Sequence, residues 1–166
     1  MRPWALLLLI GTGIPSLTAQ ADTSVYRNGV YAEVLGAAGL GSLNYERVLW
    51  EDAPLELGAR IGVGVLHFTD FTRRFNPDLV LPIGVVACYG HRVKGEIGGG
   101  PSITSIVYPD EVSFAPARRS ELQAWLSFGI RYQRAERGPL FRMAYTPIIE
   151  FGDWRHWGGV SAGFSF

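Results

Sequence analysis

The feature of this sequence that most restricts its fold is a strict alternation over the last residues, 157–166. The apolar side chains share one parity: Val160, Ala162, Phe164 and Phe166. The small or polar side chains share the other: Ser161, Gly163 and Ser165. Successive side chains of a β-strand point to opposite faces, so the pattern predicts a strand between two unlike environments. Two structures fit these residues equally well: the closing strand of a β-barrel in a membrane, and an edge strand of a soluble β-protein.

The first residues have the plan of a secretory signal peptide. Arg2 precedes a short apolar run that ends at Ile10, too short to cross a bilayer as a helix. The small residues Ala19 and Ala21 then form an A-x-A cleavage site. We therefore expect residues 1–21 to be removed by cleavage after Ala21, with cleavage after Ala19 as the near alternative. Residues 22–166 have a length suited to a single domain.

The overall composition restricts the function. The 15 Lys and Arg residues are balanced by 15 Asp and Glu residues, so the chain lacks the basic surface with which proteins bind nucleic acid. Cys88 is the single cysteine, which excludes an internal disulfide, and such a thiol is expected to be packed in the interior. The 21 glycines and the 13% aromatic content suit an all-β chain.

Strand-like runs follow the signal segment, with no helical period of useful length. Eight such runs cover 29–38, 43–50, 55–68, 79–89, 92–107, 121–133, 140–150 and 157–166. Most reach the ~9–11 residues that a tilted membrane strand needs, against about five or six for an average globular strand. Short connections at 51–54, 90–91 and 134–139 alternate with longer ones at 69–78 and 108–120, although the connection at 39–42 is also short. This order predicts an all-β fold, an eight-stranded antiparallel up-and-down transmembrane β-barrel.

Alternation along these runs separates an apolar face from a polar one. In run 121–133, Leu126 and Phe128 lie on one face, and Trp125 and Ser127 lie on the other. The polar face is rich in Gly, Ser and Ala, as a narrow lumen requires, and its long charged side chains have both signs, so they can pair inside a barrel. We predict a luminal charge network of Glu33, Glu46, Glu56, Arg60, Lys94, Glu96, Glu121, Arg131, Arg142 and Glu150. The alternative is a soluble lipocalin-like barrel, in which the apolar face points inward and these charges face water.

Aromatic residues gather near the ends of the predicted strands. They are Trp50, Phe68, Tyr89, Tyr108, Tyr132, Phe141, Phe151, Trp154, Trp157 and Phe166. Interfacial girdles of membrane barrels use aromatic rings in this way, whereas a soluble core would concentrate them toward strand centres. The distribution favours the membrane barrel. Trp157 has luminal parity, so a girdle position there requires a bulge or a strand end.

Short motifs spread over the whole chain after the signal segment carry a family resemblance. They lie at 30–36, 42–47, 82–84, 128–132, 141–147 and 157–166. In these motifs the chain resembles the small eight-stranded outer-membrane barrels of OmpA/OmpX-like architecture, particularly a broad family of uncharacterised barrels from Gram-negative bacteria. The resemblance implies a barrel in the outer membrane and supplies no activity. It also implies that the last strand, with Phe164 and Phe166, is the C-terminal insertion signal read by the barrel-assembly machinery.

A search for catalytic groups gives one weak candidate set. His67, Asp70 and Ser113 fall at the predicted external end, where a His–acid–Ser set would suit acyl transfer. No histidine of this chain stands in the His-x-Ser pattern of the lipid A deacylases that it resembles in size. We therefore expect no catalytic residues and no enzyme activity, with lipid A modification as the alternative. The histidines lack ligand-like spacing as well, so neither a metal nor a cofactor is expected.

The predicted role is that of a small integral outer-membrane barrel, structural, envelope-stabilising or engaged in surface interactions. Eight strands leave no open aqueous channel, so a general porin is not expected. Arg73-Arg74 and Arg118-Arg119 lie in predicted external loops, where they are solvated charges or, alternatively, contacts to lipopolysaccharide phosphates. Expected partners are outer-membrane lipid, lipopolysaccharide and the barrel-assembly machinery, with no nucleic acid, and the protein is expected to be a monomer. A soluble secreted lipocalin-like binding barrel is the remaining alternative.

Overall fold

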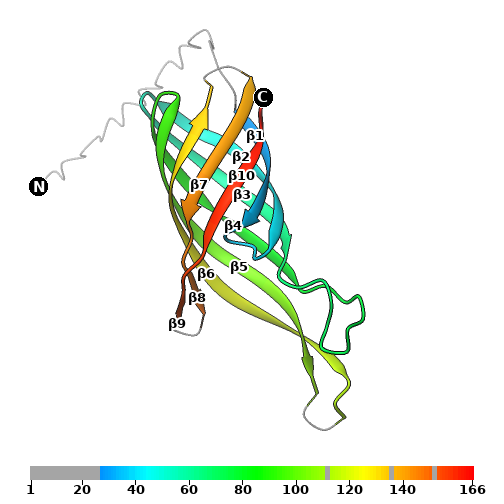
Figure 1. Cartoon of the computed structure of the whole chain (residues 1–166). Helices are drawn as coiled ribbons and strands as arrows, with labels where there is room; N and C mark the ends of the chain where they lie inside the picture. Colours follow the sequence, from blue (N-terminus) through cyan, green and yellow to red (C-terminus); the bar gives the residue numbers. More distant parts are fainter. Residues whose placement is uncertain (1–26, 111–112, 135–136, 151–152) are drawn as a thin grey trace, which may run out of the picture.

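The computed structural model describes residues 27–110, 113–134, 137–150 and 153–166, which form a closed antiparallel β-barrel of eight strands (Figure 1). Its segments are β1 Asn28–Leu35, β2 Gly41–Asp52, β3 Leu55–Val65, β4 Leu79–Gly90, β5 Val93–Pro109, β6 Pro116–Gln133, β7 Gly138–Tyr145, β8 Ile148–Glu150, β9 Asp153–Arg155 and β10 Gly158–Ser165. β8 continues the line of β7 along β6, and β9 continues that of β10, so the ten segments make eight barrel strands.

The barrel closes between its first and last strands. β1 pairs with β2 on one side and with β10 on the other, in a register from Gly29↔Ser165 to Leu35↔Gly159. The ring is completed by β5 and β6, which pair from Val93↔Tyr132 to Pro109↔Pro116. The last strand is therefore the closing strand of the barrel, and not an edge strand.

The two ends of the barrel differ in their connections. The C-terminus, the start of β1 and the connections β2–β3, β4–β5 and β6–β7 lie at what we call the turn end, the upper end in Figure 1. At Gly90, φ is 135° and an added Cβ would lie 2.5 Å from the Val93 carbonyl oxygen, so this tight turn requires glycine. The opposite, loop end carries connections 36–40 and 66–78, the β5–β6 hairpin, and segment 146–157 with β8 and β9.

Apolar side chains cover the outside of the barrel, and polar side chains fill the inside. Met143 and Val160 are 58% and 54% exposed, whereas their neighbours Arg142 and Ser161 are 3% and 6% exposed. Phe128 likewise faces outward, and Trp125 on the same strand is fully buried. The predicted faces are therefore confirmed, and their direction is that of a membrane barrel, opposite to that of a lipocalin-like one.

Some strand limits differ from those that the sequence predicts. The expected loop at 108–120 is mostly strand, because β5 and β6 continue as a two-stranded ribbon beyond the barrel rim. Both faces of that ribbon meet solvent, so its sequence carries no apolar alternation. The expected seventh strand, 140–150, is interrupted at residues 146–147, where Pro147 has no amide hydrogen to donate. The first strand ends at Leu35 because Gly36 turns the chain with φ 89°.

The predicted girdle residues lie mainly on the outside near both ends. Trp50 and Tyr89 are 47% and 66% exposed near the turn end, and Phe68 and Trp154 are each 56% exposed at the loop end. Trp157 instead lines a cavity at the mouth of the barrel. Phe151 and the signal peptide predicted at 1–21 lie outside the described residues. Among those described, no helix is long and apolar enough to cross a membrane.

Candidate functional site

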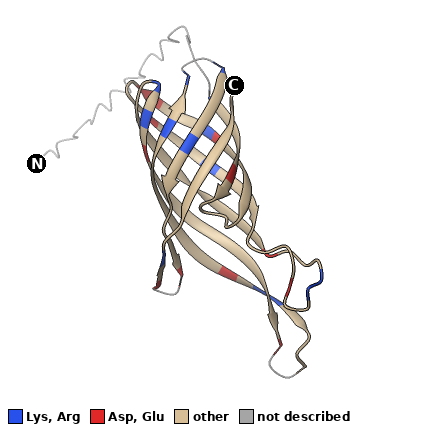
Figure 2. Ribbon diagram, in the orientation of Figure 1, with Lys and Arg blue, Asp and Glu red and all other residues tan. Residues whose placement is uncertain are grey.

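Most Lys, Arg, Asp and Glu positions on the strands of the barrel lie in the half next to the turn end (Figure 2). Adjacent positions on β2 and β3 bring Glu46 opposite Arg60, and adjacent positions on β6 and β7 bring Arg131 opposite Arg142. All four are at most 5% exposed. Strand parity therefore directs both signs of charge into one narrow space.

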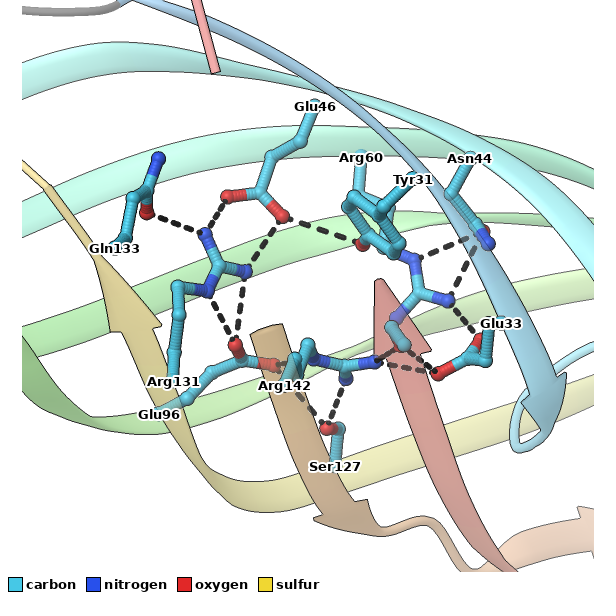
Figure 3. A network of polar contacts seen from close by, with 11 residues as sticks. Tyr31, Glu33, Asn44, Glu46, Arg60, Glu96, Ser127, Arg131, Gln133 and Arg142 are labelled. Carbon is cyan, nitrogen blue, oxygen red and sulfur yellow. Dashed lines mark hydrogen bonds and ion pairs between the residues drawn. The ribbon is translucent and has the colours of Figure 1, made fainter. Parts of the chain in front are cut away.

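Six of these residues form one chain of alternating carboxylates and guanidinium groups: Glu46, Arg131, Glu96, Arg142, Glu33 and Arg60 (Figure 3). Glu96 lies at its centre, with Oε1 accepting from Arg142 Nε at 2.5 Å and Oε2 accepting from Arg131 Nε at 2.9 Å. Glu33 joins the next two cations, since its carboxylate oxygens lie 2.5 Å from Arg142 Nη1 and 2.5 Å from Arg60 Nη2. We call this set the luminal charge network.

The ion pair between Arg131 and Glu46 spans the lumen. Arg131 is on β6 and Glu46 is on β2, two strands that lie on opposite sides of the eight-stranded ring. Arg131 donates to Glu46 through both terminal nitrogens, one of them at 2.8 Å from Glu46 Oε2. A bidentate pair of this kind holds its two strands at a fixed separation.

Two aromatic rings lie against Arg60, with Tyr31 among the charged groups and Trp125 on the side of the loop end. The Arg60 guanidinium carbon lies 5.4 Å from the centre of the Tyr31 ring and 5.1 Å from that of Trp125, within the range of cation–π attraction. The Trp125 indole fits against β4 because residue 84 is glycine: an added Cβ there would lie 2.5 Å from Trp125 Cζ2. Sequence alternation placed Trp125 in the lumen but gave no indication of this contact.

Of the other four predicted network residues, two lie beside this chain of ion pairs and two lie near the loop end. Lys94 pairs with Glu56. Glu121 is near the loop end, where it accepts from the Tyr108 hydroxyl at 3.4 Å and faces Arg119 Nε at 3.5 Å. Glu150, on β8, accepts from Gln123 Nε2 at 2.9 Å. The predicted set is thus divided between the two ends of the barrel.

The luminal charge network can hold the strands in position and fill the lumen, which is a structural role. Its groups are buried, and each is ion-paired with another of them, which is the condition under which buried charge is tolerated. Arg60 Nη1 is the nitrogen of the network without a hydrogen-bond partner among the described residues. Among the described residues, no group of three or more His, Cys, Asp and Glu side chains comes together in a way that could hold a metal ion.

The three residues considered for acyl transfer each bond to a different partner. His67 Nδ1 lies 3.1 Å from Asp78 Oδ2, and Ser113 Oγ donates to Asp110 Oδ1 at 2.8 Å. Asp70 Oδ1 accepts from the Thr72 hydroxyl at 2.6 Å, and this hydrogen bond is the main cause that lowers the pKa of Asp70 from its usual range. The geometry does not bring a His–acid–Ser set together from these residues.

The paired arginines of the external connections also differ from each other. Arg118 ties the β5–β6 ribbon to the β3–β4 connection, since its Nη2 donates to Asn76 Oδ1 at 2.6 Å and to the Pro77 carbonyl at 3.1 Å. Arg119 is largely exposed. Arg118 therefore has a structural role that the sequence did not indicate.

Comparison with solved structures finds the same architecture. The N-terminal β-barrel domain of Pseudomonas aeruginosa OprF matches with a TM-score of 0.57 at 14% identity, over 85% of this chain and 99% of that one. Neisserial surface protein A matches with a TM-score of 0.51 at 14% identity, over 83% of this chain and 95% of that one. No family model matches the chain, and no curated protein matches it either. At this identity the likeness is one of fold, and the fold is that of the small eight-stranded outer-membrane barrels.

Proposed function

We propose that this protein is a small integral barrel of the outer membrane that contributes to envelope structure or presents its loops for surface contacts. It is not a porin, and it is not an enzyme. The single observation that carries the proposal is the combination of an apolar exterior with a charged, internally paired lumen. Its partners are outer-membrane lipid and lipopolysaccharide, and we expect it to act as a monomer.

The apolar exterior supports a membrane location on energetic grounds. Side chains such as Ile83, Val85 and Met143 are 43%, 65% and 58% exposed on the barrel wall. Burying such a side chain fully contributes about 1.5–3 kcal/mol, and soluble monomers rarely expose contiguous apolar patches beyond a few hundred Å². Hydrocarbon chains of a bilayer would cover this surface, and over the described residues each strand of the closed ring pairs with a neighbour on both sides, as a strand in lipid must.

The luminal charge network supports a role other than transport. Its side chains reach across the lumen from β1, β2, β3, β5, β6 and β7, and Trp125 lies against them from the loop-end side. A barrel of eight strands has an interior just wide enough for side chains to fill. We therefore expect no conductance comparable to that of a porin.

The test is extraction of the membrane fraction with detergent, followed by electrophoresis with and without boiling. A folded membrane barrel should migrate differently in the two samples, and the purified protein should show no porin-like conductance in planar bilayers. Recovery of the mature protein as a water-soluble monomer, or large stable channels, would refute the proposal. For the enzyme alternative, an altered lipid A profile in a deletion strain that a His67→Ala variant fails to restore would contradict the non-catalytic role.

The last strand provides a separate test of the assembly partner. Phe164 and Phe166 are 50% and 43% exposed on the outer face of the barrel, next to the turn end. If the barrel-assembly machinery reads this strand, deletion of Phe166 should reduce the amount of heat-modifiable protein in the outer membrane. Insertion at the wild-type level would count against that partner.

A further inference from the structure

The mouth of the barrel at the loop end contains a cavity of about 220 Å³ that the proposed function does not use. All four connections of the loop end contribute to its wall, for example through Ala37, His67, Tyr108 and Glu150. We call this cavity the vestibule. Its size is below the ~300–1,000 Å³ of common ligand pockets, which restricts it to small molecules.

Two carboxylates lie in the wall of the vestibule, each beside a basic side chain that is largely exposed. The side chains of Asp78 and Glu150 are 9% and 11% exposed, whereas those of their partners His67 and Arg155 are 68% and 64% exposed. The carboxylates are thus fixed in the wall, and the basic side chains lie at the solvent-facing rim. Because the rim side chain is exposed and the carboxylate is not, a ligand can take the place of the rim side chain only if it brings a donor of its own to the carboxylate.

Glu150 has one oxygen that is held only by the ion pair with the exposed Arg155 among the described residues. Its Oε1 accepts from Gln123 Nε2 at 2.9 Å. Its Oε2 lies 2.8 Å from Arg155 Nη2 as an ion pair but takes part in no hydrogen bond among the described residues, although it is buried. A buried carboxylate oxygen with an unused acceptor position favours a ligand that brings a charged N–H group.

The rest of the vestibule wall is apolar and aromatic. Leu66, Val80, Ile106 and Ile148 line it together with the ring of Trp157. This accounts for Trp157 at a position where a girdle residue did not fit the strand parity. An apolar wall beside a carboxylate suits an amphiphilic cation, whose body packs on the wall and whose ammonium can also lie against an indole face.

We propose that the vestibule binds a small organic cation, a primary amine with an aryl or short alkyl body. The ammonium group donates to Glu150 Oε2 in place of Arg155, and the apolar body lies against Ile106, Ile148 and Trp157. The inner wall gives no passage to the turn end, because Trp125 and the luminal charge network fill the lumen beyond it. The site therefore recognises its ligand without transporting it.

In the experiment, the purified, detergent-solubilised full barrel is titrated with phenethylamine, and binding is measured by calorimetry or by tryptophan fluorescence. Phenylethanol and phenylpropionate serve as neutral and anionic probes with the same ring. A charge-assisted hydrogen bond contributes about 1.5–3 kcal/mol, so the amine should bind about tenfold or more tighter than the alcohol, and the anion should not bind detectably.

Two variants move the affinity in opposite directions. Glu150→Gln should weaken amine binding at least tenfold, whereas Arg155→Gln should strengthen it by removing the competing cation. Glu51→Gln changes an exposed carboxylate at the turn end and should leave binding unchanged. A gain on Arg155→Gln cannot come from damage to the fold, so the proposal can be tested even if Glu150→Gln folds poorly.

Several results would overturn the proposal. They are no binding of the amine, equal binding of amine and alcohol, preference for the anion, unchanged affinity in Glu150→Gln, and weaker binding in Arg155→Gln. These results concern a purified barrel, so they are independent of the fractionation that tests the membrane location. Heat-modifiable migration of every variant shows that each is folded before it is titrated.

Discussion

Neutralising Glu96 is the sharpest test of the luminal charge network, because this carboxylate connects two guanidinium groups. Its two oxygens lie 2.5 Å from Arg142 Nε and 2.8 Å from Arg131 Nη2, and its side chain is fully buried. The Glu96→Gln variant keeps the volume of the side chain and removes the charge. It leaves three arginines facing Glu33 and Glu46, an excess of one positive charge in the lumen.

The expected cost follows from the burial of both partners. Removing one member of a buried ion pair costs about 3–5 kcal/mol, because the remaining charge is left uncompensated. With a urea m-value of about 2 kcal/mol/M, the unfolding midpoint should fall by about 2 M. The measurement is urea unfolding of the barrel in phospholipid vesicles, followed by tryptophan fluorescence and by heat-modifiable migration.

A second substitution distinguishes charge imbalance from simple loss of a contact. In Glu96→Gln/Arg142→Gln the network is neutral again, and Glu33 keeps Arg60 as its partner at 2.5 Å. We expect the double variant to be more stable than the sum of the single effects by about 1–3 kcal/mol, as for residues in one ion-pair network. Glu51→Gln, an exposed carboxylate, is the control. A midpoint for Glu96→Gln within about 0.3 M of the wild type, well below the shift expected for a buried pair, would refute the reasoning.

Three further predictions concern other parts of the barrel. A side-chain carbon at position 100 would lie 2.1 Å from the Ile83 carbonyl oxygen, so Gly100→Val should lower the folded yield in a refolding assay. Gly95→Ala, where the nearest atom to the added carbon lies at 3.9 Å, should fold normally, and equal yields for the two variants would contradict the close packing. Trp125→Ala removes the fully buried indole from beside Arg60 and should lower the urea midpoint of unfolding, whereas Trp154→Ala, on the outside, should change it little; equal midpoints would contradict the packing. The Thr72 amide resonance should titrate with a midpoint below 3.8, the ordinary value for aspartate, because the Thr72 hydroxyl and amide stabilise the ionised Asp70. The hydrogen bonds should persist above that midpoint and be lost as the pH falls through it. A midpoint at or above 3.8 would exclude the effect.

The faces of the strands could be predicted from sequence because side-chain direction has a period of two residues. Parity alone assigns position 143 to the lipid-facing side and position 142 to the lumen. The partners within the lumen could not be predicted in this way. Glu33 and Arg142 are 109 residues apart, and Glu46 and Arg131 are 85 apart, so their contacts depend on the stagger of strands around the ring. That stagger is set by closure of the whole barrel and cannot be predicted from the sequence of any single strand.

The connections of the loop end were the least predictable part for a related reason. The ribbon of β5 and β6 beyond the rim contacts solvent on both faces, and its polar composition resembles that of a loop. The vestibule was missed because its carboxylates come from a connection and from the short strand β8, at Asp78 and Glu150. The sequence does contain one indication of the vestibule. Glu150 has luminal parity and ends the predicted strand 140–150, at the opposite end of the barrel from most of the other luminal charges.

The two halves of the lumen therefore differ in how their polar groups are satisfied. In the turn-end half, carboxylates and guanidinium groups alternate and bond to one another, with Arg60 Nη1 as the network nitrogen that lacks a hydrogen-bond partner among the described residues, so substitutions there should affect stability. Nearer the loop end, Ser102 Oγ, Thr146 Oγ1 and Trp125 Nε1 are buried without a hydrogen-bond partner among the described residues. Buried polar groups of this kind are ordinarily satisfied by water, so we expect this half to be hydrated. A ligand can displace water, but it cannot displace side chains that are ion-paired with one another, so we expect this barrel to bind a small molecule at the vestibule. Substitutions around the vestibule should affect ligand binding more than stability.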